Sequence, residues 1–141
     1  DRWGHADLWL HTAIHAAPMS PAAHVDARDW TKSAEVNATA TANLIPMVQP
    51  LLLAAPAGQA VFFDDPRAGA ANFASYGATK AAQMALARSW QAETAKTGPR
   101  IHILTPEPMP TATRARFFPG EDRADLTQVS AEATRLLALL T

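Results

Sequence analysis

Short runs of large apolar side chains recur three times along the chain, and longer amphipathic stretches separate them. The runs cover residues 7–13, 60–63 and 100–106, and each is bounded by small or turn-forming residues. Such runs, apolar on both faces, predict buried strands. Helical patterns over residues 29–55, 76–96 and 129–141 alternate with them. This order predicts an α/β fold with a parallel sheet covered by helices on both sides.

Residues that begin or end helices set the expected boundaries. Asp29 is the expected N-cap of the first helix, and Ser130 is the expected N-cap of the last. Gly98, followed by a proline, ends the middle helix. Pro46 and Pro50 lie inside the first helical pattern. Because each removes a backbone donor and crowds the preceding turn, we expect a kink or a break there.

Composition narrows the class of protein. The 141 residues fit one domain, residues 1–141, and 48% of them are hydrophobic. A net charge of −1 argues against nucleic-acid and lipid-surface binding. The absence of cysteine excludes disulfides and agrees with a reducing, cytoplasmic location. No apolar run reaches the roughly 18 residues of a membrane helix. The sequence starts with neither an initiator Met nor a basic-then-apolar signal pattern. We therefore expect a fragment or a processed chain.

Five histidines raise the question of a metal site. His11 and His15 are four residues apart, which is the spacing of two ligands on one helix. The pattern places them on a strand end and a loop instead, where residues four apart do not converge. No carboxylate or cysteine stands at a third-ligand spacing, so we expect no metal.

Tyr76 and Lys80 are the strongest candidates for chemistry. On a helix, residues four apart share a face, so both side chains can enter one cleft. A lysine cation lowers the pKa of a nearby tyrosine, which can then exchange a proton with a hydroxyl or carbonyl oxygen. The alternative is a half-buried Tyr76 beside a solvated Lys80. In parallel sheets the ligand crevice lies beyond the carboxyl ends of the strands, here after Leu10, Phe63 and Leu104.

The segment around this pair resembles a known family. "YGATKAA", after a strand and a small-residue loop, resembles the Tyr-x-x-x-Lys segment of the short-chain dehydrogenase/reductase family. "DLWLHTAIH", "EVNATATANLIPMVQPLLL", "GQAVFF" and "RIHILTPEPMPT" resemble that family's fourth strand, following helix, fifth strand and sixth strand with its loop. The resemblance extends over about residues 7–119 at consistent spacing.

The resemblance implies a Rossmann-like, three-layer, doubly wound parallel sheet, present here in part, with about three strands alternating with helices. It also implies hydride transfer between NAD(P) and a carbonyl or alcohol substrate. The choice between NADP and NAD is set near the end of the family's second strand, which has no counterpart here, so the sequence does not decide it, and NADP is taken as slightly preferred without a signal in these residues. Tyr76 would be the general acid/base, Lys80 would hold the nicotinamide ribose, and Asn37 would help fix Lys80 through a water. The remaining cofactor contacts would come from Thr12, Ala13, Pro106 and Thr111.

Departures from the family pattern fall at functional positions. The family's catalytic serine lies just after the fifth strand, where this chain has no hydroxyl. Asp64 and Asp65 stand there, and we expect them to be solvated loop carboxylates. Ile14 and Glu107 replace glycines next to the cofactor. An alternative to the enzyme is therefore a catalytically inactive relative that serves as a scaffold or subunit.

Two expectations concern partners and the rest of the fold. The family's N-terminal glycine-rich nucleotide-binding half has no counterpart in this sequence. The strand from Asp7 to Ala13 would then be an exposed apolar edge, which another segment or chain should cover. The helices that carry Asn37 and Tyr76 would join subunits of a homo-oligomer. Phe117 and Phe118 would either line an apolar substrate pocket or anchor their loop.

Overall fold

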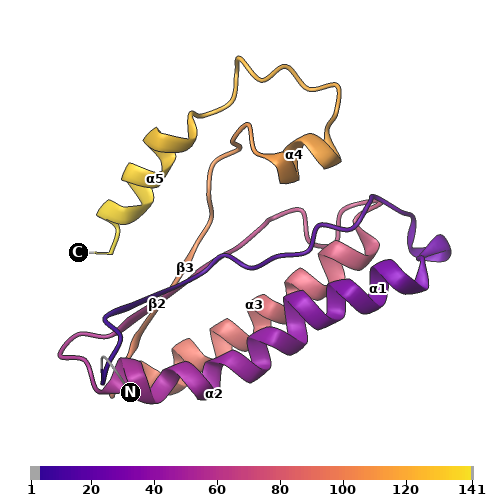
Figure 1. The fold of residues 1–141 in the computed structure, drawn as a ribbon. Helices are drawn as coiled ribbons and strands as arrows, with labels where there is room; N and C mark the ends of the chain where they lie inside the picture. Colours follow the sequence, from indigo (N-terminus) through magenta and orange to yellow (C-terminus); the bar gives the residue numbers. More distant parts are fainter. Residues whose placement is uncertain (1–3, 141) are drawn as a thin grey trace.

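Three parallel strands form one sheet in the computed structural model, which describes residues 4–140 (Figure 1). The strands are β1 (Leu8–His11), β2 (Gln59–Phe63) and β3 (Arg100–Leu104), and β2 lies between the other two. In the register, Leu10 stands opposite Val61, which stands opposite His102. The predicted parallel sheet of an α/β fold is confirmed.

The position of each strand in the sheet decides its burial. In the central strand, Ala60, Val61 and Phe62 are all 1% exposed or less. At the edge, β1 leaves Leu8 and Leu10 42% and 43% exposed. The expected burial of the first run on both faces is therefore wrong, whereas the expected exposed apolar edge is confirmed. Apolar character alone cannot distinguish an edge strand from a central one.

A long helical stretch follows β1 and packs under the sheet (Figure 1). It consists of α1 (Ala27–Ser33), the π-helical η2 (Ala34–Thr39) and α2 (Ala40–Leu53), after a short 3-10 turn η1 (Ala22–His24). Its N-cap is Asp26, whose Oδ1 accepts hydrogen bonds from the backbone N–H groups of Arg28 and Asp29 at 2.8 and 3.1 Å. Asp29 therefore lies inside the first turn, and its prediction as the cap is wrong.

Pro46 and Pro50 do not break this helix. Both lie within α2, and both are exposed. The side chains that hold α2 to the core include Ile45, Val48 and Leu52. Since the prolines are exposed, carbonyls left without a helical donor have water within reach, and packing of the apolar stripe maintains the helix. Of the predicted kink or break, the break is wrong for this reason, and the kink stays a prediction.

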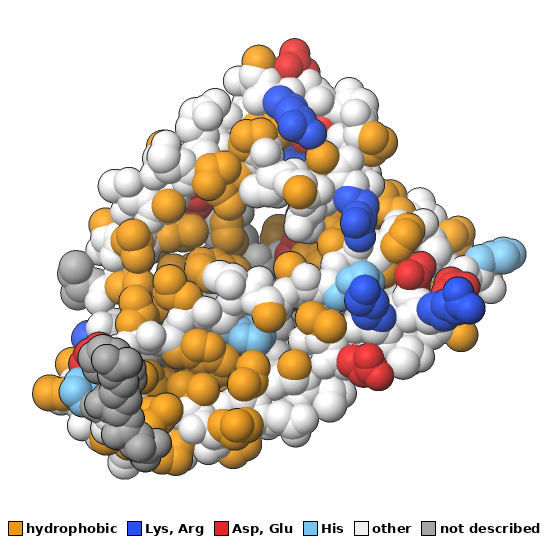
Figure 2. Space-filling view, viewed as in Figure 1, with side chains coloured by type: hydrophobic (Ala, Val, Ile, Leu, Met, Phe, Trp, Pro, Cys, Tyr) orange, Lys and Arg blue, Asp and Glu red, His pale blue; other side chains and the backbone are white. Residues whose placement is uncertain are grey.

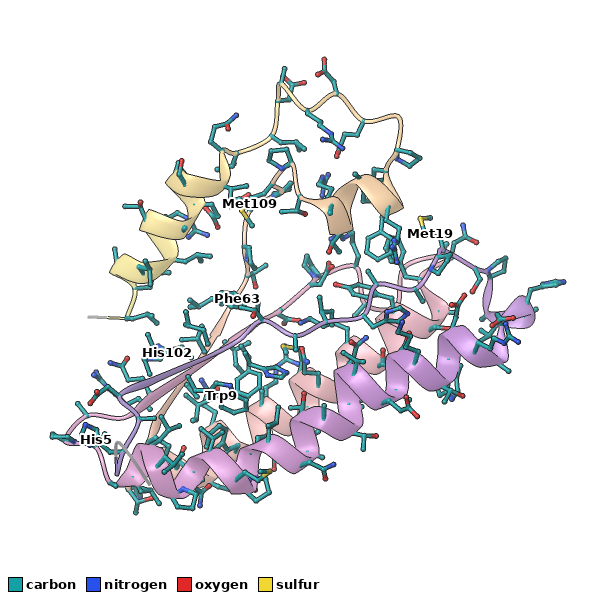
Figure 3. All side chains as sticks on the ribbon, in the orientation of Figure 1. His5, Trp9, Met19, Phe63, His102 and Met109 are labelled. Atoms are coloured by element: carbon teal, nitrogen blue, oxygen red, sulfur yellow. The ribbon has the colours of Figure 1, made fainter. Side chains whose placement is uncertain are left out.

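The second helix, α3 (Ala74–Thr94), lies beside α2 under the same face of the sheet (Figure 1). The core between the helices and the sheet contains Leu52, Phe62, Met84 and Trp90. Figure 3 shows Trp9 pointing to this helical side and Phe63 to the opposite side. The side chains of each strand thus alternate between the core and a second face.

Two helices stand over that second face (Figure 1). They are α4 (Ala112–Phe117), which the sequence pattern did not indicate, and α5 (Val129–Ala138). Gln128 is the N-cap of α5, and Ser130 lies inside the helix, so the predicted cap is wrong. Together the layers form a partial Rossmann-like fold. Within the described residues, no helix is both long and apolar enough to span a membrane.

A buried carboxylate attaches α5 to the loop after β3. Glu132 is 1% exposed, and its Oε1 accepts a hydrogen bond of 2.8 Å from the backbone N–H of Glu107. Arg135 donates to both carboxylate oxygens of Glu132, at 2.6 and 2.8 Å. These bonds, that from Arg135 foremost, lower the pKa of Glu132 to about 2.

Phe62 should be among the most stabilising side chains, because it is fully buried against Trp9 and Trp90. We expect Phe62→Ala to lower the free energy of unfolding by about 3–5 kcal/mol, measured by urea denaturation. Asp125 is exposed in the loop before α5, so Asp125→Ala should change the free energy of unfolding by no more than about 0.5 kcal/mol. Equal effects of the two substitutions would contradict the assigned core.

Attachment of α5 should be sensitive to acid. Because the folded pKa of Glu132 lies below its ordinary value of 4.5, its stabilising effect is present above that value and is lost as the pH falls toward about 2. Hydrogen-exchange protection of the Glu107 amide should fall over this range. Glu132→Gln keeps an acceptor that does not titrate, so its protection should stay constant. Constant protection in the unsubstituted protein would refute the assignment.

Candidate active site at the carboxyl ends of the strands

A cavity of about 910 Å³ opens where the three strands end. Its walls are the segments that follow β1, β2 and β3, one face of α5, and the beginning of α3. Figure 2 shows this face of the molecule, with hydrophobic side chains gathered around the hollow. The cavity is lined by every residue predicted to contact a cofactor: Thr12, Ala13, Tyr76, Lys80, Pro106 and Thr111.

Tyr76 and Lys80 reach this cavity from one face of α3. Both are only 6% exposed, and both line the cavity wall. The spacing of four residues thus produces the shared orientation that the sequence predicts. The alternative in which Lys80 is solvated is wrong, because the sheet and the neighbouring helices enclose its long side chain.

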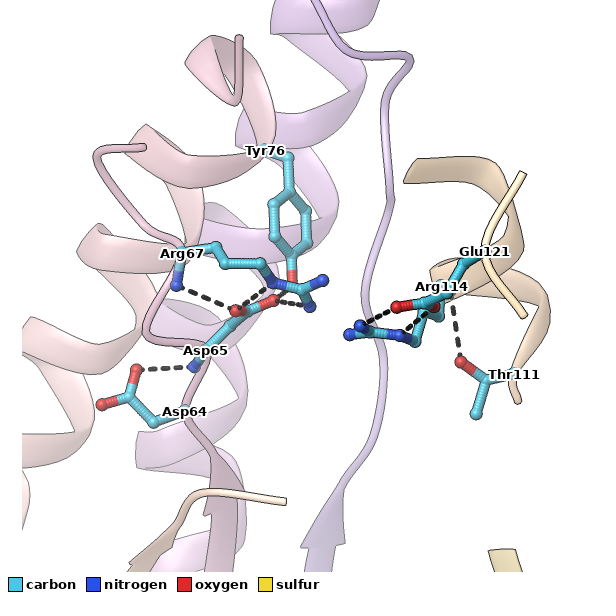
Figure 4. A network of polar contacts seen from close by, with 7 residues as sticks. All are labelled: Asp64, Asp65, Arg67, Tyr76, Thr111, Arg114 and Glu121. Atoms are coloured by element: carbon cyan, nitrogen blue, oxygen red, sulfur yellow. Dashed lines mark hydrogen bonds and ion pairs between the residues drawn. The ribbon is translucent and has the colours of Figure 1, made fainter. Parts of the chain in front are cut away.

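The phenol of Tyr76 belongs to a buried polar cluster (Figure 4). Its Oη donates a hydrogen bond of 2.7 Å to Oδ2 of Asp65. Arg67 binds the same carboxylate through two bonds, Nε to Oδ1 at 2.9 Å and Nη2 to Oδ2 at 2.7 Å. The backbone N–H of Arg67 donates to Oδ1 as well, at 3.0 Å. The carboxylate therefore stands between the phenol and the guanidinium.

This cluster makes Tyr76 a weaker acid than a free tyrosine. Burial, and then the hydrogen bond and negative charge of Asp65, raise the pKa of Tyr76 well above its ordinary value. The sequence predicted the opposite shift, driven by the Lys80 cation. The prediction failed because burial of the phenol, and then its direct contact with the Asp65 carboxylate, act in the opposite direction. Burial raises the pKa of Asp65, but the hydrogen bonds from Arg67 and Tyr76 outweigh burial and lower it.

Asp65 was expected to be a solvated loop carboxylate, and this expectation is wrong. It is 7% exposed. Asp64 is half-buried rather than free, and its Oδ2 accepts a bond of 2.6 Å from Nη2 of Arg88. Both aspartates line the cavity. Their partners Arg67 and Arg88 lie on a loop and on α3, so the type of residue alone does not reveal these ion pairs.

Aromatic rings enclose the cluster from the side of α4. Phe117 is 3% exposed, and its ring lies 4.9 Å from that of Tyr76 and 5.0 Å from that of Phe73. The guanidinium of Arg67 lies 5.3–5.8 Å from the rings of Phe73, Phe117 and Phe118. Neither Phe117 nor Phe118 lines the cavity. Of the two roles considered for them, the structure favours anchoring of the loop.

Lys80 is held by a glutamine that sequence reasoning missed. Its Nζ donates a hydrogen bond of 2.7 Å to Oε1 of Gln83. Burial lowers the pKa of Lys80 to about 8, although the charges of Asp64 and Asp65 oppose this shift. Gln83 lies three residues after Lys80 on the buried face of α3 and is 1% exposed. In the sequence, Gln83 is a polar residue at helical spacing among the positions that pack inward. This is the signal that could have indicated its role.

Gln83 also connects Lys80 to the end of β1. Its Nε2 lies 3.1 Å from Nε2 of His11 and donates to the backbone carbonyl of Asn37 at 3.1 Å. His11 Nε2 lies 3.0 Å from Oγ1 of Thr41. Burial, and then the Lys80 charge, lower the pKa of His11, which agrees with a neutral ring that accepts from the amide.

Asn37 lies in the neighbouring helical segment, as expected, and its link to Lys80 through a water stays a prediction. It is fully buried in the π-helical η2 and does not line the cavity. Its side chain accepts from the backbone N–H of His15 at 2.6 Å and donates to the carbonyl of His15 at 3.0 Å and to Thr79 at 2.9 Å. The direct partner of Lys80 in the described structure is Gln83. The direct bonds of the Asn37 side chain fix the segment after β1.

Two other departures noted in the sequence also reach the cavity. Ile14 and Glu107 both line it, at the positions where the resembled family has glycine. The histidine pair does not come together as ligands, since His11 bonds to Gln83 and Thr41 while His15 bonds to Asn37 through its backbone. Among residues 4–140, no group of three or more side chains is placed to hold a metal.

With this geometry established, comparison with known proteins identifies the class. The sequence model of the short chain dehydrogenase family matches residues 1–122. The chain therefore belongs to the short-chain dehydrogenase/reductase family of oxidoreductases. Among curated proteins, it is 33% identical over 119 residues to the uncharacterized oxidoreductase YciK of Escherichia coli K12.

Solved structures show the same fold. A short chain dehydrogenase from Salmonella enterica serovar Typhi superposes with a TM-score of 0.92 at 28% identity, over 99% of this chain and 58% of that one. The Escherichia coli YciK structure gives 0.88 at 28% identity, over 99% and 57%. A short chain dehydrogenase from Escherichia coli CFT073, complexed with NADPH, gives 0.88 at 29% identity, over 98% and 58%.

The chain spans about half the length of these relatives. The alignment with YciK covers 80% of this chain but only 45% of YciK. The family model, which matches residues 1–122, includes the pair of Tyr76 and Lys80 and all three strand ends.

Asp65 should control the acidity of Tyr76. We expect Asp65→Asn to lower the midpoint of the Tyr76 titration by about one pH unit or more, because it removes the negative charge that disfavours the phenolate. Tyr76 is the single tyrosine of the chain, so the ultraviolet absorbance of tyrosinate reports it directly. Asp122→Asn, an exposed position, should leave the curve unchanged. If Asp65→Asn leaves the midpoint unaltered, Asp65 does not control the acidity of Tyr76.

Proposed function

We propose that this protein transfers hydride between NAD(P) and a carbonyl or alcohol substrate, with Tyr76 exchanging the proton. The observation that carries the proposal is the placement of Tyr76 and Lys80, one turn apart, on the cavity at the strand ends. Membership of the short-chain dehydrogenase family supports it. The NADPH complex of the similar Escherichia coli CFT073 protein supports NADP as the preferred cofactor.

The residues around Lys80 fit the nicotinamide and ribose portion of this cofactor. The Lys80 ammonium has three N–H groups, and Gln83 accepts only one of them in the described contacts, so donors remain for ribose hydroxyls. Thr111 and Pro106 form the facing wall, and Thr12 and Ala13 form the side near β1. The sequence contains no glycine-rich turn, so these residues do not form a pyrophosphate cradle. When bound, the cofactor supplies or accepts the hydride.

The buried polar cluster defines how Tyr76 would act. Because burial and Asp65 keep the phenol protonated, Tyr76 is suited to be the general acid in carbonyl reduction. Its proton would pass from Oη to the carbonyl oxygen of the substrate while the carbonyl carbon is reduced. That proton is directed at Oδ2 of Asp65, so a substrate oxygen has to compete with this carboxylate.

A second candidate function is a cofactor-binding scaffold without turnover. The observation that favours it is the same hydrogen bond, because Asp65 engages the only hydroxyl proton that Tyr76 can donate. No serine or threonine hydroxyl follows β2 to polarise a carbonyl, since this segment reads "FFDDPRAG". Cofactor would then bind at Lys80 without efficient proton transfer.

We also propose that copies of the protein associate through the outer faces of the long helices. The exposed apolar side chains of α2 support this interface, since Met47 is 68%, Leu51 37% and Leu53 51% exposed. A separate segment or chain would cover the free edge of β1, where Leu8 and Leu10 are exposed. Such an additional strand would pair with the unsatisfied backbone groups of that edge.

Cofactor binding tests the proposal. NADPH and NADH are titrated into the protein while the fluorescence of the reduced cofactor is followed, and turnover is assayed with a panel of aldehydes and ketones. We expect saturable binding with NADPH tighter. Tyr76→Phe should lower turnover by roughly 10²–10⁴-fold and leave affinity nearly unchanged, because it removes only the transferable proton.

The outcomes separate the two candidates. Binding with turnover that depends on Tyr76 supports the oxidoreductase. Binding with no turnover on any member of the panel supports the scaffold. A folded sample that binds neither nucleotide excludes both. Ser89→Ala, on an exposed position of α3, is the matched control and should leave affinity and turnover unchanged.

A further inference from the structure

We propose that Lys80 is a nucleophilic amine that condenses with small aldehydes inside the cavity, forming an imine. This goes beyond the proposed function, in which Lys80 binds the cofactor without forming a covalent bond. The proposal begins with an arrangement that is unusual for a lysine. The side chain is 6% exposed, yet it lines a cavity of about 910 Å³.

The partner of the Lys80 amine is neutral. Nζ donates to the amide oxygen Oε1 of Gln83 at 2.7 Å. Among the ion pairs found in residues 4–140, none includes Lys80. An amide accepts a hydrogen bond without compensating the charge, so the ammonium form loses hydration and gains little in return. Enclosure without a counter-ion is the condition that activates lysines as nucleophiles.

The charged groups nearby are occupied by other partners. Asp65 is bound by Arg67 through two hydrogen bonds, and Asp64 is bound by Arg88. Their charges act on Lys80 from a distance and only partly oppose the effect of burial, which lowers the pKa of Lys80 to about 8. The other titratable neighbour is His11, at the end of β1, whose own pKa is lowered by burial and by Lys80.

The other lysines of the chain provide an internal reference. The sequence has three lysines, and the other two, Lys32 and Lys96, are exposed and also lie outside any ion pair found in the described residues. Their amines are open to water, and neither lines the cavity at the strand ends. Of the three lysines, only Lys80 is enclosed and also lines that cavity. Selectivity for Lys80 follows from burial rather than from access.

The reaction is balanced without any further reagent. The lone pair of Nζ attacks the aldehyde carbon, the C=O π electrons move to oxygen, and a proton passes from nitrogen to that oxygen. The resulting carbinolamine loses water to give a C=N bond, so no electrons are gained or lost overall. Aldehydes are favoured over ketones because their carbonyl carbon carries only one substituent and is more open to attack by the amine.

Reductive trapping tests this site in the unsubstituted protein. The purified protein is incubated with acetaldehyde and sodium cyanoborohydride, which reduces the imine to a stable ethylamine, and the modified peptides are quantified by mass spectrometry. At about pH 7 we expect Lys80 to be modified at least roughly tenfold faster than Lys32 and Lys96. The ratio should shrink as the pH rises toward about 10, where exposed lysines also lose their protons.

Two variants sharpen the result. Gln83→Glu places a carboxylate beside Nζ and should slow modification of Lys80 at about pH 7 while Lys32 and Lys96 react as before. Lys80→Arg should abolish modification at this position. The ratio in the unsubstituted protein does not depend on either variant folding. If Lys80 reacts no faster than Lys32 and Lys96 at about pH 7, the proposal is overturned, whether or not the protein binds NADPH or turns over.

Discussion

The hydrogen bond between the Tyr76 phenol and the Asp65 carboxylate organises the site, because a carboxylate can remain buried only while its charge is compensated. Asp65 obtains that compensation from Arg67, which in turn lies against the rings of Phe73 and Phe117. The loop after β2, the start of α3 and the segment around α4 therefore meet at one carboxylate. Its charge fixes both the position of the phenol and its protonation.

A second buried network extends behind the cavity and contains no ion pair. Gln83 joins Lys80 on α3 to His11 at the end of β1 and to the backbone carbonyl of Asn37 in η2. The amide of Gln83 links these groups because it accepts from Lys80 through its oxygen and donates through its nitrogen. The two networks meet on α3, one turn apart. One holds an acid in its protonated form, and the other holds a base close to losing its proton.

The sequence predicts the fold through local signals and the site only in outline. The apolar runs and Gly98 define strands and a helix end, because they act over a few residues. The pair of Tyr76 and Lys80 follows from helical spacing alone. The burial of Asp65 does not, because Asp65 belongs to a cluster that includes a residue distant in sequence. The ring of Phe117 lies 4.9 Å from that of Tyr76, which binds Asp65. The break predicted at Pro46 failed in the same way, because packing of the whole helix outweighs the loss of one backbone donor.

Contact between Phe117 and Tyr76 has a consequence for how such sites diversify. The segment around α4 follows β3, far in the chain from the helix that carries the reactive pair. A change of length or sequence there alters the dielectric surroundings of the phenol as well as the shape of the chamber. Changes in this segment would therefore alter the proton affinity of Tyr76 and the fit of a ligand at the same time. Exchanging the segment between relatives would change both properties together.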